Sequence, residues 1–395
     1  MLLKEYLDIN KLEQHIADGY VEQRFHKEFP LVLYVYGRPC VFDNMWDDVS
    51  SKCRGLIVHK FTGEIIARPF EKFHNYGTDW APETMPNNLP KTAPLITTKL
   101  DGNLITLYNW NGRTYAASKG SFHSEHADWA NAWLEKHYGP RPYFYAEGRT
   151  MVCEMIAETV QHHVVHYGVE GLFLLAVINN ETGEELDSAT LEQWAAAQSI
   201  KFVKPLTIDM AQALKDNNKN EEGYVLAWPR PGQTPVRVKV KFIDFLRLQR
   251  LLHSTGPKEI LDYMRHPHLQ CYLREALDPK LSTPEFIEFV KGWQHKLQDR
   301  FDFIYTAARV RHMLAQAIVR GLEGNNSDDH LAPWDRRKVY AQIVNGQNGH
   351  DFEAFAYPAV CFAMLDGDEE RVTKAVWKQV EPLVTGNTRF IREDA

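Results

Sequence analysis

The segment Leu95-Ile96-Thr97-Thr98-Lys99-Leu100-Asp101-Gly102-Asn103-Leu104 places a lysine between two β-rich runs. The first run ends at the lysine, a turn-forming Asp-Gly pair follows, and an apolar run resumes at Leu104. A lysine beside a glycine turn can approach a phosphate with little steric hindrance, and its neutral amine is a nucleophile. The segment therefore indicates either a phosphate-binding, nucleophilic lysine or a plain hairpin turn with a solvated lysine.

Further β-rich runs recur before residue 252, and turn signals such as Asn111-Gly112 and Pro231-Gly232 separate them. Because several of these runs are spaced as hairpins, we expect largely antiparallel sheets. The helical stretches Ser124–His137 and Ser188–Gln198 interrupt the strands. The expected strands, besides Leu95–Lys99, are Leu31–Tyr36, Gly55–His59, Leu104–Trp110, Gly171–Ile178, Tyr224–Trp228 and Val236–Phe242.

After Leu252 the pattern becomes helical and strand-like alternation nearly disappears. The sequence predicts an α+β domain over residues 1–252, built of antiparallel sheets flanked by helices, and an all-helical domain over residues 253–395. Polar, Gly- and Asn-rich stretches at Gly321–Asp329 and Asn345–His350 are expected to be loops. The expected helices are Glu259–Arg265, Pro284–Ile318, Pro333–Val344 and Asp368–Val380.

The composition of the 395 residues, 44% hydrophobic and 25% charged, is that of a globular protein and excludes disorder, collagen and coiled coil. Neither a membrane span nor a secretory signal is expected, because no apolar run approaches ~20 residues and acids stand at Glu5 and Asp8. The five scattered cysteines form no CxxC pair, which favours reduced thiols and a cytoplasmic location. The net charge of −7 means that any polyanion must be held by a local cationic cluster.

A candidate for such a cluster lies in the strand Val236–Phe242. Strict alternation places Arg237, Lys239 and Lys241 on one face of this strand and apolar residues on the other. Like charges side by side repel, so an anion opposite them would relieve the cost. The alternative is an amphipathic strand whose basic face is simply solvated.

Two acids and three other cations stand in settings that suit chemistry. Glu154 is flanked by apolar residues on both sides and Glu222 opens an apolar run, so each carboxylate needs a partner such as a lysine, a ribose hydroxyl or a metal-bound water. Arg54, Lys72 and Lys119 lie beside small or turn-forming residues, as phosphate-binding cations often do. Structural ion pairs and solvated surface cations are the respective alternatives.

The order of these motifs resembles that of the covalent nucleotidyltransferases, the polynucleotide ligases and mRNA capping enzymes. Lys99 matches the nucleophile motif of that superfamily, Glu154 and Glu222 match two acidic motifs, and Lys239 with Lys241 matches the last. Within the superfamily, four further segments are similar to the phage-type, ATP-dependent tRNA-repair RNA ligases, also called the RNA ligase 1 family. These segments are Arg68–Asn75, Ser118–Ser121, Glu181–Glu184 and Leu252–Thr255.

The resemblance implies an ATP-dependent RNA ligase that works through lysyl-AMP and RNA-adenylate intermediates. Lys99 would attack the α-phosphate of ATP, and Lys239 and Lys241 would neutralise that phosphate and help depress the pKa of Lys99. Arg54, Lys72 and Lys119 would hold the other phosphates. Glu154 would accept from a ribose hydroxyl, and Glu222 would contact Mg²⁺ (or Mn²⁺) through water. The resemblance also implies Tyr36 as part of the nucleoside pocket.

The implied substrate is RNA with 5′-phosphate and 3′-hydroxyl ends, and above all a nicked tRNA, which the helical domain would recognise by shape. A monomer is expected, in the host cytoplasm if a phage encodes the protein. The sequence departs from the family pattern at Asn103, where Ser is usual, and at His74, where Phe is common. His162, His163 and His166 invite a zinc interpretation, but no carboxylate or cysteine supports their spacing.

Two other functions stay open at this point. A DNA ligase or a GTP-dependent capping enzyme usually carries an arginine where this chain has Leu104, and an OB-fold of short strands usually follows the last motif. A non-catalytic RNA-binding protein on a ligase scaffold would be expected to have lost Lys99, Lys239 or Lys241, and all three are present.

Overall fold

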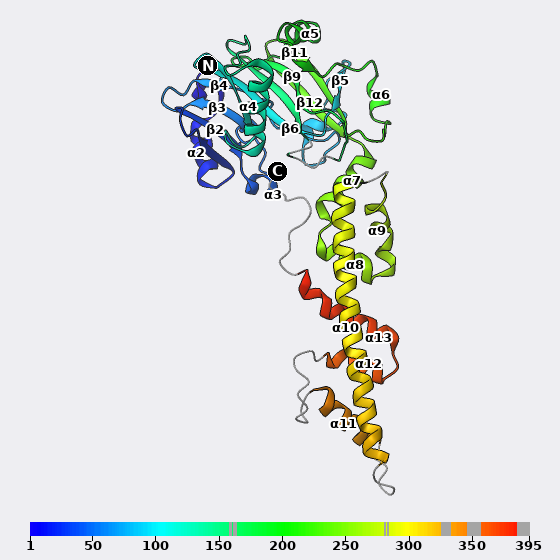
Figure 1. Cartoon of the computed structure of the whole chain (residues 1–395). Coiled ribbons are helices and arrows are strands. Elements are labelled where there is room, and N and C mark those ends of the chain that lie inside the picture. Colours follow the sequence, from blue (N-terminus) through cyan, green and yellow to red (C-terminus); the bar gives the residue numbers. More distant parts are fainter. Residues whose placement is uncertain are drawn as a thin grey trace. The chain divides into compact units, whose positions relative to one another are not determined.

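The computed structural model describes residues 1–157, 160, 164–279, 282, 284–324, 333–345 and 357–384. The described chain forms two compact units, Met1–Arg247 and Leu248–Ala395. The first unit mixes strands and helices, and the second is helical in its described parts, which confirms the expected α+β class with a helical C-terminal region (Figure 1).

The first of three sheets lies near the N-terminus and has the order β1-β2-β3-β4, all antiparallel. Its central strand β2 is buried on both faces, which explains why its sequence is a continuous apolar run rather than an alternating one. One face packs on the short N-terminal helices and the other on Tyr108 and Ala117 of the second sheet. The elements are β1 (Val21–Phe25), β2 (Leu31–Tyr36), β3 (Arg54–His59), β4 (Ile65–Ala67), α1 (Leu3–Tyr6), α2 (Ile9–Ala17) and α3 (Arg38–Phe42).

The second sheet has the order β10-β9-β8-β6-β7, and all its strand pairs are antiparallel except the pair of β10 with β9. Helix α4 covers one face, with Ala130 and Leu134 packed against Ile105 and Leu107. The Ser124 hydroxyl caps the start of α4 by accepting from the Ala127 N–H. The elements are β6 (Asn103–Trp110), β7 (Arg113–Ser118), β8 (Arg149–Ile156), β9 (Gly171–Asn179), β10 (Lys201–Phe202), α4 (Glu125–Tyr138) and α5 (Ser188–Ala197).

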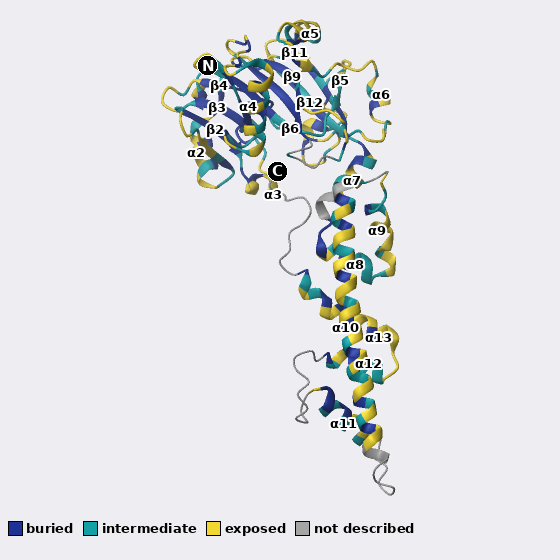
Figure 2. Cartoon of the chain, viewed as in Figure 1, coloured by how far each residue is buried: buried dark blue, intermediate teal, exposed yellow. Residues whose placement is uncertain are grey.

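The third sheet has the order β12-β11-β5, and both strand pairs are antiparallel. Trp228 and Val238 fill its core side, and Figure 2 shows that the strands of this unit are largely buried. The elements are β5 (Leu95–Lys99), β11 (Gly223–Arg230), β12 (Gln233–Lys241), α6 (Met210–Ala213) and the 3₁₀ turn η1 (Pro82–Thr84), and α7 (Ile243–Ser254) runs across the boundary between the units.

The second unit is built around one long helix, α10, against which α8, α11, α12 and α13 pack. This helix continues to Gly324, so the loop expected from Gly321 is wrong at its start. An isolated glycine costs a helix only about 1 kcal/mol, which a long helix tolerates. The elements are α8 (Pro257–Arg265), η2 (Pro267–Leu269), α9 (Gln270–Ala276), α10 (Pro284–Gly324), α11 (Pro333–Val344), α12 (Pro358–Leu365), α13 (Glu369–Val380) and η3 (Glu381–Leu383).

None of the helices in the described part of the chain is both long and apolar enough to cross a bilayer.

Candidate active site

Lys99 lies at the end of β5, where its side chain is mostly buried and 21% exposed. Its Nζ donates to Glu222 Oε2 at 2.5 Å and to the Leu100 carbonyl at 3.5 Å. The strands on either side of Lys99-Leu100-Asp101-Gly102 belong to different sheets. The segment is therefore a crossing between sheets, and the alternative of a plain hairpin with a solvated lysine is wrong.

Gly102 makes this crossing possible because a larger residue would not fit. A Cβ at position 102 would overlap the Met155 carbonyl oxygen and lie 2.8 Å from Cγ of Glu154. The loop after Lys99 can therefore press directly onto β8, which carries Glu154.

Glu222 bridges two lysines at the start of β11. Its Oε2 accepts from Lys99, and its Oε1 lies 2.9 Å from Nζ of Lys241. The strand register explains the bridge, because Gly223 pairs with Lys99 on one side and with Lys241 on the other. Gly223 has a φ of +146° and lies against the Val240 carbonyl, where a side chain would collide. Glu222 is 3% exposed, so its charge is balanced almost entirely by these two ammonium groups.

The pKa of Lys99 is raised, which is opposite to the depression expected from the sequence. Burial alone would lower it, but the nearby carboxylates of Glu222 and Glu154 outweigh burial. Burial raises the pKa of Glu154 to about 7. The negative charge of Glu222 adds to this rise, and the positive charge of Lys99 opposes it. In the free protein Lys99 is therefore an ammonium ion held by an acid.

Lys239, Lys72, Arg54 and Lys119 form a cationic group beside this centre. Burial, with repulsion from Lys72, Lys241, Lys99 and Arg54, lowers the pKa of Lys239 to about 7. Burial also lowers the pKa of Lys72, and Arg54 and Lys119 add to the effect. Within the described residues no acid lies within ion-pair distance of these four cations. The arrangement suits an external anion, because such an anion would relieve the mutual repulsion.

Tyr36 lies among these cations. Lys72 Nζ and Lys119 Nζ lie 5.4 Å and 5.1 Å from the centre of its ring. Burial raises the pKa of the Tyr36 hydroxyl, but Lys119, Lys72 and Arg54 outweigh burial and lower it. The hydroxyl of Tyr36 is therefore placed to contact a phosphate or a ribose close to these cations.

Arg237 differs from the other cations of its strand. Its guanidinium donates twice to Glu185, to both carboxylate oxygens at 2.7 Å, and stacks over Phe70. The alternation of β12 is as expected, with Val238 buried on the opposite face. Two carboxylates of the protein itself relieve part of the repulsion between the cations of this strand. Glu185 pairs with Arg237, and Glu222 pairs with Lys241. Arg237 is therefore one partner of a structural ion pair with Glu185, and its charge is not available to a phosphate in the way that the other cations are.

Asp101 has a role that the sequence analysis missed. Its Oδ2 accepts from the backbone N–H groups of Val164 and Val165 at 2.7 and 3.0 Å, and its own N–H donates to the Tyr167 hydroxyl at 2.6 Å. These bonds tie the loop after Lys99 to the segment that follows β8. A carboxylate beside a glycine turn was the available signal, but its partners lie more than 60 residues away.

The histidine cluster considered for zinc falls largely outside the described residues, which do not include His162 and His163. His166 is described, and Asn220 bonds both its backbone N–H and its carbonyl. Nowhere in the described chain do three or more His, Cys, Asp or Glu side chains form a metal-binding group.

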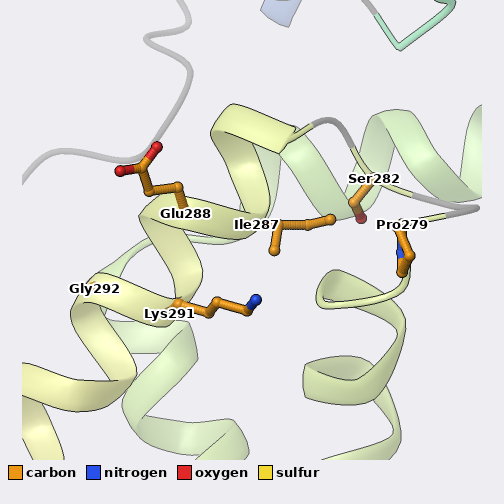
Figure 3. A pocket seen from close by; sticks show the side chains of 6 residues that line it. All are labelled: Pro279, Ser282, Ile287, Glu288, Lys291 and Gly292. Carbon is orange, nitrogen blue, oxygen red and sulfur yellow. The ribbon is translucent and has the colours of Figure 1, made fainter.

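A pocket in the second unit is separate from all of these residues. It lies beside the start of α10 and is lined by Pro279, Ser282, Ile287, Glu288, Lys291 and Gly292 (Figure 3). Since none of the expected site residues lines it, the candidate active site is the cluster in the first unit.

Comparison with known proteins finds similarity to RNA ligases. A family model described as RNA ligase matches residues 52–242, a region that contains Arg54, Lys72, Lys99, Lys119, Glu154, Glu222, Lys239 and Lys241. The RNA ligase of Rhodothermus phage RM378 is 22% identical, over 87% of each chain. A Thermovibrio ammonificans protein with a provisional RNA-ligase designation is 26% identical over 53% of this chain, and the match spans 55% of that relative's length.

Solved structures to which this chain is weakly similar include an archaeal ATP-dependent RNA ligase. The two are 13% identical, and their superposition covers 77% of this chain and 81% of the other, with a TM-score of 0.45. A Naegleria gruberi RNA ligase mutant with ATP and Mn is 14% identical and covers 39% of this chain and 50% of its own, with a TM-score of 0.31. Likenesses this weak carry no argument about function. The similarity that does carry weight is in sequence: residues 52–242, which hold the whole lysine and carboxylate cluster, match the RNA ligase family model, and the chain is similar to a phage RNA ligase over most of its length.

Proposed function

We propose that the protein is an ATP-dependent ligase that joins RNA 5′-phosphate and 3′-hydroxyl ends through lysyl-AMP and RNA-adenylate intermediates. One observation carries the proposal: within the segment that matches the family model, the Nζ of the mostly buried Lys99 lies 2.5 Å from Glu222, beside four cations that have no acidic partner among the described residues. That combination supplies a nucleophile and a binding site for several phosphates in one place.

In the first step Lys99 Nζ attacks the α-phosphorus of ATP. An N–P bond forms, the bond to the bridging oxygen of the β-phosphate breaks, and pyrophosphate leaves. The amine must lose its proton, and Glu222 Oε2, which already accepts a hydrogen bond from that amine, is the carboxylate oxygen placed to take it. Lys239 and Lys241 neutralise the charge that develops on the α-phosphate, while Arg54, Lys72 and Lys119 hold the departing phosphates.

In the second step the RNA 5′-phosphate oxygen attacks the adenylate and displaces Lys99. In the third step the RNA 3′-hydroxyl attacks the activated phosphate, a phosphodiester bond forms and AMP leaves. Each step spreads negative charge over phosphate oxygens, so the same cations serve all three.

We propose Mg²⁺ (or Mn²⁺) as the divalent ion at this site. Such an ion keeps several of its waters and binds mainly to nucleotide phosphates, so it needs few protein ligands. Glu222 would contact it through water, and the ion would supply charge neutralisation for the leaving pyrophosphate.

Nucleotide and metal dependence test the reaction class. We expect transfer of label from α-labelled ATP to the protein, at least tenfold weaker transfer from GTP, and none after chelation of divalent ions. Equal or better labelling by GTP would instead favour a capping enzyme. A parallel assay with non-hydrolysable ATP labelled in the γ-position controls for non-covalent binding.

We also propose that the physiological substrate is a cleaved tRNA anticodon loop and that residues 253–395 recognise its shape. The proposed working state is a monomer in the cytoplasm.

We expect a 1–252 fragment to retain adenylylation because all the nucleotide motifs lie before residue 253. Its loss of sealing should be greater on nicked tRNA than on a short linear RNA.

This prediction is checked by comparing the full chain and the fragment on nicked tRNA, linear RNA and nicked duplex DNA, after circular dichroism shows that the fragment is folded. Equal losses on the two RNAs would remove the recognition role of the tail. Faster sealing of nicked DNA than of either RNA would contradict the RNA substrate.

A further inference from the structure

Four aromatic side chains form a continuous row beside the cationic group. The rings of Tyr36 and Trp46 are 4.9 Å apart, those of Trp46 and His74 are 5.4 Å apart, and those of His74 and Trp80 are 4.7 Å apart. All three contacts are edge-to-face. The proposed chemistry at Lys99 makes no use of Trp46 or Trp80.

The inner end of this aromatic row is Tyr36, which lies 5.4 Å from Lys72 Nζ and 5.1 Å from Lys119 Nζ, measured to the centre of its ring. Lys72 Nζ is 4.7 Å from the centre of the Trp46 ring, and the Lys239 N–H donates to the His74 carbonyl at 3.1 Å. The outer end, Trp80, is 49% exposed, whereas His74 is 7% exposed. The row therefore leads from the phosphate site towards solvent.

Trp80 is exposed on a loop that is firmly held. The Thr84 hydroxyl is fully buried, accepts from the Thr78 N–H at 2.9 Å and donates to the Ala81 carbonyl at 2.8 Å. The Thr84 carbonyl accepts from the Gly77 N–H at 3.0 Å. An indole held half in water by such a loop costs solvation free energy, which a stacked ligand would recover.

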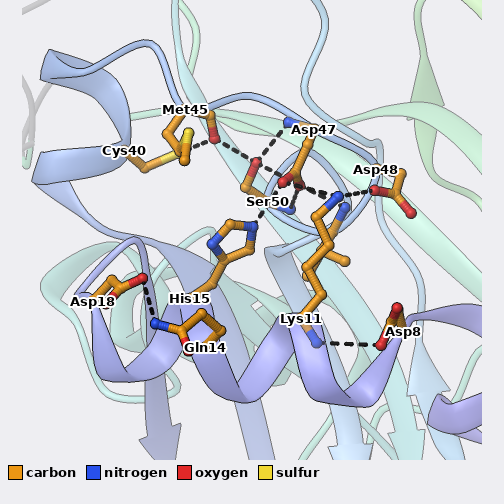
Figure 4. A network of polar contacts seen from close by, with 11 residues as sticks. Asp8, Lys11, Gln14, His15, Asp18, Cys40, Met45, Asp47, Asp48 and Ser50 are labelled. Carbon is orange, nitrogen blue, oxygen red and sulfur yellow. Dashed lines mark hydrogen bonds and ion pairs between the residues drawn. The ribbon is translucent and has the colours of Figure 1, made fainter.

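Trp46 is held in a similar way by the polar network of Figure 4. The Asp47 carboxylate accepts from the N–H groups of Val49 and Ser50 and from Nε2 of His15. The Ser50 hydroxyl donates to the Met45 carbonyl at 2.7 Å. Because this network fixes the residues on both sides of Trp46, the indole is positioned before any ligand arrives.

His74 completes the row as a neutral ring. Burial, together with the charges of Lys72 and Lys239, lowers its pKa to about 4. At neutral pH it adds no charge to the site and contributes an aromatic surface between the two indoles.

We propose that Trp80 and Trp46 form a stacking site for the nucleobase at the 5′-phosphate end of the RNA substrate, whose phosphate lies on Lys72 and Lys119. This inference rests on the proposed ligase function and extends it to the recognition of the RNA end. Aromatic side chains next to a cationic groove bind single-stranded nucleic acid with little preference for sequence, because every base has a π-face.

The test uses the full-length protein in single-turnover transfer of AMP from lysyl-AMP to 5′-phosphorylated oligoribonucleotides. One oligoribonucleotide carries a normal terminal base, and the other has an abasic terminal nucleotide. We expect Trp80→Ala to slow transfer to the normal RNA about tenfold or more and to leave transfer to the abasic RNA within about twofold. Trp80→Phe should recover most of the rate, and Phe61→Ala, which removes another exposed aromatic ring, should change neither rate.

Equal slowing on the two RNAs, or no slowing on either, would overturn the stacking site. Loss of lysyl-AMP formation in Trp80→Ala with the wild type active would assign the ring to the adenine of ATP instead. If the wild type forms no lysyl-AMP, the proposed function fails rather than this inference. In that case the stacking site is tested by equilibrium binding of the same two RNAs, which needs no catalysis. Trp80→Ala should then weaken binding of the normal RNA and leave binding of the abasic RNA unchanged.

Discussion

Lys99→Ala is expected to abolish self-adenylylation, a loss of at least about a thousandfold, because the Lys99 amine is the nucleophile that we propose for the N–P bond. The variant should still seal RNA that is supplied already adenylated, since the third step does not need the lysine as a nucleophile. The measurement compares label transfer from α-labelled ATP with the sealing of pre-adenylated RNA.

Lys91→Ala, at an exposed lysine shortly before β5, is the matched control and should keep both activities. Persistent labelling of Lys99→Ala would show that another residue is the nucleophile. Loss of both activities together with a lowered melting temperature would mean that the substitution had damaged the fold, and Lys99→Arg, which keeps the positive charge beside Glu222, would then replace it.

Glu222→Gln is expected to change both the rate and the pH dependence of adenylylation. Since the Glu222 carboxylate helps raise the pKa of Lys99, removing its charge should lower that pKa. The amine attacks only when neutral, so kcat/KM for ATP rises with pH until Lys99 is deprotonated, and this rise should move to lower pH in the variant. The plateau rate should fall about 10- to 100-fold, because two charge-assisted contacts are lost.

Glu221→Gln, at the neighbouring and less buried acid, is the control for the general change in charge. The pH profile of Glu221→Gln should match that of the wild type. An unchanged profile in Glu222→Gln, or one moved to higher pH, would contradict the account of the Lys99–Glu222 pair.

Local sequence patterns predicted several strands and helices together with their bounds. Leu31–Tyr36, Leu95–Lys99 and Pro333–Val344 have the bounds that were expected. Pairing between distant strands was not predictable in this way. The partner of Lys99 on β11 lies more than 100 residues further along the chain, and no local pattern encodes that register.

The same limit explains which parts of the site were predicted. Residue type and motif order identified Lys99, Glu222 and Lys239 as candidates, and these three lie in or beside one cluster. The predicted direction of the pKa shift of Lys99 was wrong. The actual direction depends on how closely two carboxylates approach Lys99 in the folded protein. Arg237 was misjudged for a related reason, since its partner Glu185 is 52 residues away in sequence.

The two tryptophans of the aromatic row gave no signal in the sequence. Trp46 and Trp80 lie in irregular segments on opposite sides of Arg54 and Lys72, and nothing in their spacing indicates that both contact His74. Only the folded loops, held by Asp47 and Thr84, bring them together.

Peptide mapping can show whether Lys99 carries the nucleotide, as we propose. The full-length protein is incubated with ATP and Mg²⁺, digested at neutral pH and analysed by mass spectrometry. We expect a single AMP adduct on the peptide that contains Lys99, and this adduct should disappear when pyrophosphate is added because the first step is reversible. An adduct on another lysine, or none in a protein that still seals RNA in an ATP-dependent reaction, would contradict this proposal.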